Sequence, residues 1–230
     1  MAESSTSALL EGTVLDLATD VVSALRSGDH VRAGTVPTRP EPLARAAVRV
    51  LGADTLLPSV LLPLPPDPAL LALFEQAVAA HPPGADAAPT VVWSHWAMNR
   101  TLRGIAEGAT GGDGREPDAD WLDDASWQLL THQLAVLAPL AVPGADCAVA
   151  RAARRRPVDV ARGFVRAVRR RDWQQAAGAG RWLTLLDGVP DTLGLAAGLD
   201  FVELMGGENP RVALQLEAAR LMNVPTGVLR

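Results

Sequence analysis

The stretch PVDVARGFVRAVRRRDWQQAAGAGRWL, residues 157–183, decides the fold class. Pro157 suits the first turn of a helix, where no amide donor is needed, and Asp172 is a good N-cap for a second helix. The alanines and glycines of 176–180 have side chains too small to keep a neighbouring helix away. We therefore expect an all-α protein in which helices pack closely on one another.

Two further helix starts follow, at Pro190 and at Pro210, and the second is preceded by the good N-cap Asn209. The four starts have the spacing of paired antiparallel helices, as in helical repeats of roughly 34 residues. This pattern predicts a multi-helix bundle with tandem antiparallel helical hairpins, solenoid-like, in the C-terminal third. A compact bundle explains the same starts and is an open alternative.

Helices are also predicted along the first 143 residues. Leucine and valine recur at three- and four-residue steps before Gly28, which can take the left-handed conformation that ends a helix. Asp67 and Pro68 are a good cap and first residue for another helix. We expect helices that end at Gly28 and Gly52, one that begins at Pro68, and helices over 90–107 and 120–138.

Two segments interrupt this helical pattern. The apolar segment 56–66 contains four prolines, too many for a helix or a central strand, so we expect it to lie extended against the core. The segment 108–119 is glycine-rich and acidic and should form a mobile surface loop. We expect a helical N-terminal region over 1–143 and a paired-helix region over 144–230, with one continuous domain as the alternative.

The composition is that of a globular protein without membrane spans. Its 230 residues are 48% hydrophobic, enough for one sizeable core or two modest ones. A single cysteine, Cys147, allows no intrachain disulfide, and the sequence shows no signal-peptide or membrane-spanning pattern, so we expect a cytoplasmic protein. All 21 basic residues are arginine, which is typical of a GC-rich bacterial genome and implies no mechanism.

Four polar residues are weak candidates for a catalytic site. His95, Asn99 and Arg100 lie on the helix predicted over 90–107, and His132 lies on a later one. Their side chains suit hydrogen bonding to a polar substrate, but core anchoring by the neighbouring tryptophans is the favoured interpretation of this region. The four histidines lack the spacing of a metal site, and we expect neither a metal nor another cofactor.

The strongest electrostatic feature lies between residues 151 and 181, which include ten arginines and only two aspartates. Apolar residues at helical spacing predict the buried face of the central helix, at Val158, Ala161, Val165 and Val168. With that face buried, four arginines point outward and form a candidate partner-binding surface: Arg162, Arg166, Arg169 and Arg170. The segment 107–124 holds seven acidic residues and one arginine. We expect the two stretches to face each other, within one molecule or across a homodimer.

These features favour a non-catalytic helical interaction module, an adaptor or accessory subunit, that presents the arginine-rich surface to a protein partner. A helical enzyme of a biosynthetic pathway is the first alternative, with a pocket near residues 93–100 and His132. A nucleic-acid-binding accessory protein is the second, and the net charge of −5 counts against it.

Overall fold

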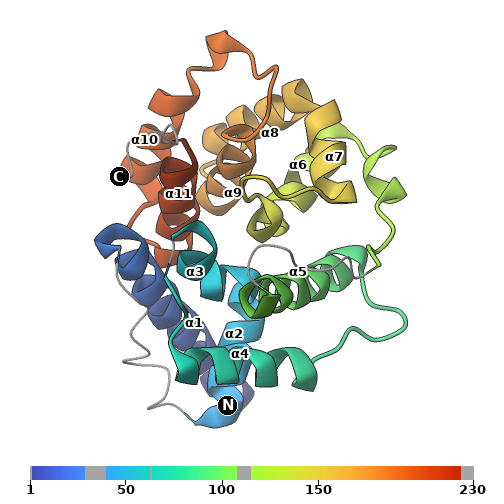
Figure 1. Ribbon diagram of the computed structural model, residues 1–230. Coiled ribbons are helices and arrows are strands. Elements are labelled where there is room, and N and C mark those ends of the chain that lie inside the picture. The colour runs from blue at the N-terminus through green and yellow to red at the C-terminus, as the bar shows by residue number, and fades with distance from the viewer. Residues whose placement is uncertain (1, 29–39, 63, 108–114, 224–230) are drawn as a thin grey trace. The chain divides into compact units, whose positions relative to one another are not determined.

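The computed structural model describes residues 2–28, 40–62, 64–107 and 115–223. Every regular element within these ranges is a helix (Figure 1), which confirms the all-α fold class. The chain divides into two compact units, unit 1 over Met1–Arg115 and unit 2 over Glu116–Arg230. None of the helices in the described ranges combines the length and the apolarity needed to cross a lipid bilayer.

Unit 1 is a cluster of helices packed around α2. Its elements are α1 Ala2–Ser27, α2 Glu41–Leu51, η2 Gly52–Leu56, α3 Leu57–Leu61, α4 Pro68–Ala80 and α5 Pro89–Glu107. α2 packs against α1 and α4, and α5 packs against η2. Leu17, Val48, Phe74 and Trp93 come from four of these helices and have no exposed surface, so they form the centre of the core.

Three predicted helix ends in unit 1 are confirmed. Gly28 ends α1 at a φ of 64° and Gly52 ends α2 at a φ of 66°, in the left-handed region that favours glycine. Asp67 caps α4, because its Oδ1 accepts a hydrogen bond of 2.9 Å from the amide of Leu70. These ends depend on local chemistry, which is why the sequence is sufficient to place them.

The extended conformation predicted for 56–66 is wrong over its first half, where Leu57–Leu61 forms the short helix α3. Pro58 fits because the first turn of a helix needs no amide donor, and the amide of Leu62 donates a hydrogen bond of 2.9 Å to Pro58 O. The preceding turn η2 is buried, so this backbone must pair its own polar groups, and helical turns do so. Residue 63 lies outside the described residues, and 64–67 has no regular structure.

Unit 2 is a helical bundle with α9 at its centre. Its elements are η3 Asp120–Leu122, α6 Trp127–Val136, η4 Ala138–Leu140, α7 Ala148–Arg155, α8 Pro157–Arg169, α9 Trp173–Leu183, η5 Asp191–Leu193, α10 Leu195–Gly206 and α11 Pro210–Asn223. α9 packs against α6, α8, α10 and α11 (Figure 1). Residues 176–180 are buried, and a Cβ added to Gly178 would lie 2.9 Å from Ala135 O. The close helix approach predicted at this small-residue stretch is therefore present.

The tandem hairpins expected in the C-terminal third are not confirmed, and the contacts are those of a bundle. Each repeat of a solenoid contacts only its neighbours, whereas α9 has helices on several sides. Three predicted helix starts are found, at Pro157, after the cap Asp172 and at Pro210. The remaining one lies later than Pro190, because the turn η5 comes first and Gly194, at a φ of 59°, redirects the chain into α10.

The helix predicted over 120–138 is broken into η3 and α6. Ser126 caps α6, because its Oγ accepts a hydrogen bond of 3.3 Å from the amide of Leu129. Between the two pieces, Nη1 of Arg156 donates at 2.7 to 3.4 Å to three carbonyl oxygens, those of Leu122, Asp123 and Ala125. These carbonyls therefore face a guanidinium from a distant part of the sequence instead of the amides of a continuing helix.

The division between the units lies at Arg115 and Glu116, whereas we expected one after residue 143. α6 precedes residue 143 but packs against α8 and α9, so it belongs to unit 2. Of the surface loop expected over 108–119, residues 108–114 lie outside the described residues. Glu116 is anchored, since its Oε2 accepts a hydrogen bond of 2.8 Å from the amide of Ala148.

Candidate functional site

The arginines of α7 are paired with acidic residues of unit 2. The pairs are Arg151 with Glu116 at 3.0 Å and with Asp146 at 3.1 Å, Arg154 with Asp146 at 2.9 Å, and Arg155 with Asp123. Hydrogen bonds from Arg154 and then Arg151 hold the pKa of the Asp146 carboxyl below its usual range. The expected match between the acidic and basic stretches is thus confirmed within one molecule for Glu116 and Asp123.

α8 buries a different face from the one predicted. Its buried face centres on Val160, Phe164 and Ala167, whereas Val158 of the predicted face is 45% exposed, and of that face only Ala161 is buried. Two apolar stripes run along this helix, and contacts with other helices decide which is buried. Phe164 is its largest apolar side chain, and the adjacent Gly163 lets Thr131 of α6 approach closely, so these two residues mark the buried side.

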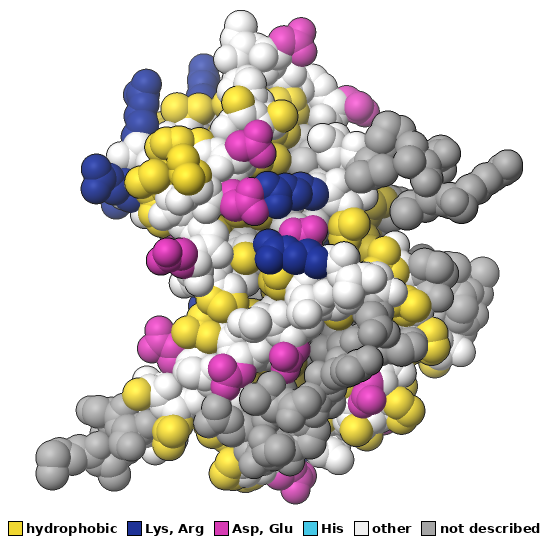
Figure 2. Space-filling view, turned by 90° about the vertical axis from the view of Figure 1, so that its left-hand side faces the viewer, with side chains coloured by type: hydrophobic (Ala, Val, Ile, Leu, Met, Phe, Trp, Pro, Cys, Tyr) yellow, Lys and Arg dark blue, Asp and Glu magenta, His cyan; other side chains and the backbone are white. Residues whose placement is uncertain are grey.

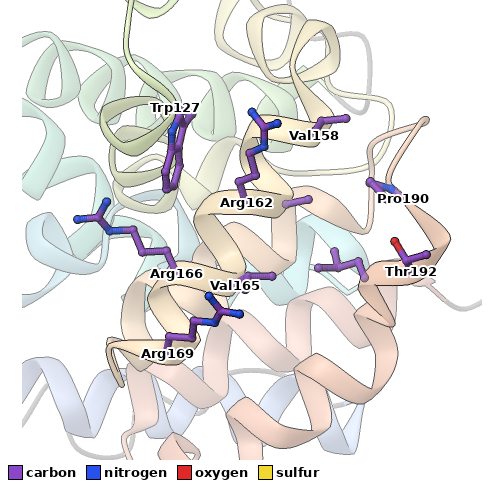
Figure 3. Close-up of a pocket in the computed structure, with 10 residues that line it drawn as sticks. Trp127, Val158, Arg162, Val165, Arg166, Arg169, Pro190 and Thr192 are labelled. Atoms are coloured by element: carbon purple, nitrogen blue, oxygen red, sulfur yellow. The ribbon is translucent and has the colours of Figure 1, made fainter.

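As a result, part of the second apolar stripe lines an open groove beside the arginines. The groove has a volume of about 510 Å³ and runs between α8 and the segment 190–193 (Figure 3). Its apolar lining consists of Trp127, Val158, Ala161, Val165, Pro190 and Leu193, and its polar lining of Arg162, Arg166, Arg169 and Thr192. Three of the four predicted partner-binding arginines therefore lie at this α8 groove, and Arg170 does not line it.

The groove arginines have few acidic partners, unlike the arginines of α7. Arg162 lies 3.5 Å from Asp159, whose carboxylate is already 2.7 Å from Arg156. Arg166 and Arg169 form no ion pair with any acidic residue in the described parts of the chain. The groove therefore presents net positive charge to solvent beside an apolar floor.

The contact between α6 and α8 fixes one wall of the groove. The guanidinium carbon of Arg166 lies 5.6 Å from the centre of the Trp127 ring, a cation–π contact. Thr131 Oγ1 donates a hydrogen bond of 2.8 Å to Trp127 O, and its side chain packs on Gly163. Figure 3 shows Trp127 and Arg166 on one side of α8 and Pro190 on the other.

The weak catalytic candidates do not belong to one unit. His95, Asn99 and Arg100 lie on α5 of unit 1, whereas His132 lies on α6 of unit 2. Asn99 Nδ2 donates a hydrogen bond of 3.0 Å to His95 O within its own helix. His132 Nδ1 lies 3.3 Å from Gln175 Oε1. No compact unit therefore holds all four side chains.

The tryptophans of α5 have structural contacts. Trp93 is fully buried and meets Trp96 edge-on, with ring centres 5.1 Å apart, which confirms its expected role as a core anchor. The guanidinium of Arg100 lies 5.3 Å from the Trp96 ring. Burial, and after it the charge of Arg49, lower the pKa of His95, so the ring is mostly neutral near pH 7.

Within the described residues, no three His, Cys, Asp or Glu side chains are grouped as a metal site requires. No known family, curated protein or solved structure matches this chain. The chemistry of the α8 groove is thus the basis on which a function can be assigned.

A second exposed surface lies on α10, and the sequence reasoning missed it. Phe201, Leu204 and Met205 are exposed there, Leu204 to 80%. Asp200 lies beside them with 75% of its side chain exposed. Glu203, which pairs with Arg220 of α11, lies beside them too and is 35% exposed. In the upper half of Figure 2, hydrophobic side chains gather beside acidic ones. The apolar residues at three- and four-residue steps next to two acids were the sequence pattern that could have revealed this surface.

Proposed function

We propose that this chain is a helical interaction module, an adaptor or accessory subunit, that binds a protein partner through the α8 groove. The observation that supports it is the contrast between neighbouring helices. The arginines of α7 are neutralised by Glu116, Asp123 and Asp146, whereas Arg166 and Arg169 form no ion pair with the described acidic residues. The chain keeps these charges available beside an apolar floor.

The composition of the groove favours a protein over a nucleic acid as the partner. Aromatic and arginine side chains over an apolar floor are typical of the centre of protein interfaces. Nucleic acid binding relies on many phosphate contacts, whereas three arginines line this groove and the whole chain is acidic. A reducing, cytoplasmic setting belongs to the same proposal and is supported by the single, buried Cys147.

The test is quantitative capture of partners from a lysate of the source cells, with the full chain as bait. The groove variant carries Arg162→Glu and Arg169→Glu. The matched control carries Arg170→Glu and Arg171→Glu, which change the net charge equally at exposed positions outside the groove lining. We expect a discrete protein that the wild type and the control retain and that the groove variant loses.

Two outcomes would contradict the proposal. A captured protein lost equally from both variants would mean that positive charge in general, and not the groove, attracts it. Capture that disappears after nuclease treatment and falls steeply with salt would assign the arginines to phosphate binding instead.

A further inference from the structure

We infer that the occupant of the α8 groove is helix α10 of a second copy of this chain, so that two copies form a two-fold dimer. The inference rests on the proposed function, since it requires the groove to be a protein-binding surface, and it names the chemistry of what binds there. It also predicts that any other partner competes with this dimer.

The first argument is charge complementarity. Arg162, Arg166 and Arg169 border the groove, and among the described residues Arg162 shares its one acidic partner with Arg156 while Arg166 and Arg169 have none. α10 has the opposite character, because Asp200 is 75% exposed and the cluster around it contains three acids and a single arginine. Opposite potentials on two surfaces favour their association and fix its register.

The second argument is that each surface keeps apolar side chains exposed to solvent. Val158 of α8 is 45% exposed and Leu204 of α10 is 80% exposed, with Phe201 and Met205 beside it. Apolar side chains at three- and four-residue steps form the contact face of a helix that lies in a groove. Covering both stripes at once removes apolar surface from water on both copies.

The third argument concerns backbone groups. The groove floor comes from α8, whose own ladder already uses its amides and carbonyls, so it offers few backbone partners to an extended chain. A helix pairs its own backbone amides and carbonyls and needs no backbone hydrogen bonds from the groove floor. The 12 residues of α10 are long enough to follow the groove from Val158 to Arg169, since those residues also span 12 positions of a helix.

The order of the stripes around each helix sets the direction of packing. Each helix can be viewed along its axis from its N-terminus and traced round in the direction in which the chain winds. On α8 this path crosses the apolar stripe and then the arginines, whereas on α10 it crosses Asp200 and Glu203 and then the apolar stripe. Apolar then meets apolar, and acid meets arginine, only when the two helices run parallel.

One wall of the groove also leads directly into α10. Pro190 and Leu193 line the groove, and Gly194 leads directly from them into α10. A two-fold interface needs a single self-complementary patch on each copy, with donor and acceptor surfaces side by side. The groove and the exposed face of α10 provide such a patch.

The experiment is to measure the mass of the full chain in solution by light scattering or sedimentation over a wide concentration range. We expect a concentration-dependent monomer–dimer equilibrium. Arg162→Glu with Arg169→Glu, and separately Asp200→Arg, should each weaken dimerisation about tenfold or more, because attractive pairs become repulsive. Arg170→Glu with Arg171→Glu should leave it unchanged.

Mixing the two weakened variants gives the decisive result. In a mixed dimer, the arginine introduced at position 200 of one copy meets the glutamates introduced at positions 162 and 169 of the other. The second contact of that dimer is wild type, so dimers should return. Leu204→Ala, a truncation at an exposed position that cannot disturb the core, should also weaken the dimer. A wild type that is monomeric throughout, a dimer indifferent to these changes, or variants that fail to complement each other would overturn the inference.

These results separate the inference from the proposed function. A monomer that still captures a protein through Arg162 and Arg169 would leave the function standing and remove α10 as the occupant. A dimer with no other partner would keep the inference and limit the function to self-association.

Discussion

Replacing Gly163 with alanine tests the contact between α6 and α8 that fixes the wall of the groove. A Cβ at this position would lie 2.0 Å from Oγ1 of Thr131 and 2.3 Å from its Cβ and Cγ2. Non-bonded carbon atoms approach no closer than about 3.5 Å at their optimum, so the helices must separate by about 1 Å or Thr131 must leave its site. Either response also displaces Trp127, because its carbonyl oxygen accepts the hydrogen bond from Thr131 Oγ1.

The size of the effect follows from two opposing terms. Overpacking a core costs about 1–3 kcal/mol, and we take the upper end because Cβ of Thr131 is fixed to the backbone of α6. Alanine regains about 1 kcal/mol over glycine inside a helix. We expect Gly163→Ala to lower the free energy of unfolding by about 2 kcal/mol.

Urea unfolding followed by circular dichroism measures this difference through the shift of the midpoint at constant slope. Gly104→Ala in α5 is the matched control, since a Cβ there meets nothing within 4 Å and should stabilise by about 0.5–1 kcal/mol. If Gly163→Ala proves as stable as the wild type, the close α6–α8 contact is refuted.

Three further predictions concern burial in the core, the partly buried contact of Arg156 with the chain before α6, and pH. Phe164→Ala should lose about 3–5 kcal/mol of stability, because this side chain is only 3% exposed, whereas Leu204→Ala should stay within about 0.5 kcal/mol, both read from urea midpoints at a concentration low enough for the chain to be monomeric. Arg156→Lys should cost about 1–3 kcal/mol, because Nη1 of Arg156 binds three carbonyls while its Nε and Nη2 bind the Asp159 carboxylate, and one ammonium cannot hold both groups at once; an unchanged melting temperature would contradict this. Burial and the Arg49 charge lower the pKa of His95, so the unfolded state takes up its proton first as pH falls through about 6.5. Stability from this residue is complete above that pH and declines below it, and His95→Gln should flatten the decline in urea midpoints measured across pH.

Helix boundaries were predictable where one residue decides them. Asp67 caps α4 and Pro157 begins α8 as their sequence chemistry requires. The ends at Gly28 and Gly52 follow from the left-handed conformation that glycine adopts at low cost. All four features depend on residues within a turn of the boundary.

The errors arose where distant residues decide the structure. At the break before α6, Arg156 binds three carbonyls that all lie more than thirty positions away in the sequence. The buried face of α8 is set by the side chain of Thr131 against Gly163, and the periodicity of α8 alone allows either stripe inside. That uncertainty of phase also hid the groove, since Val158 was expected to be covered.

The arginines at the groove were predictable because they lie on the exposed side of α8 whichever of its two apolar stripes is buried. Which of them keep their charge unpaired was not predictable, because the pairing of α7 with Glu116 and Asp123 depends on the fold of unit 2. The sequence pattern of α10 shows an apolar stripe beside two acids, but that this stripe is exposed and not buried depends on which side of α10 packs on α9.

The central position of α9 has a consequence for how the protein is made. Two glycines at 178 and 180 give this helix little stability of its own, so its order depends on the helices around it. One of these, α11, is synthesised after the others. A nascent chain that ends before Pro210 therefore lacks one of the helices that pack against α9. We expect unit 2 to fold in a single cooperative step only after α11 has been synthesised.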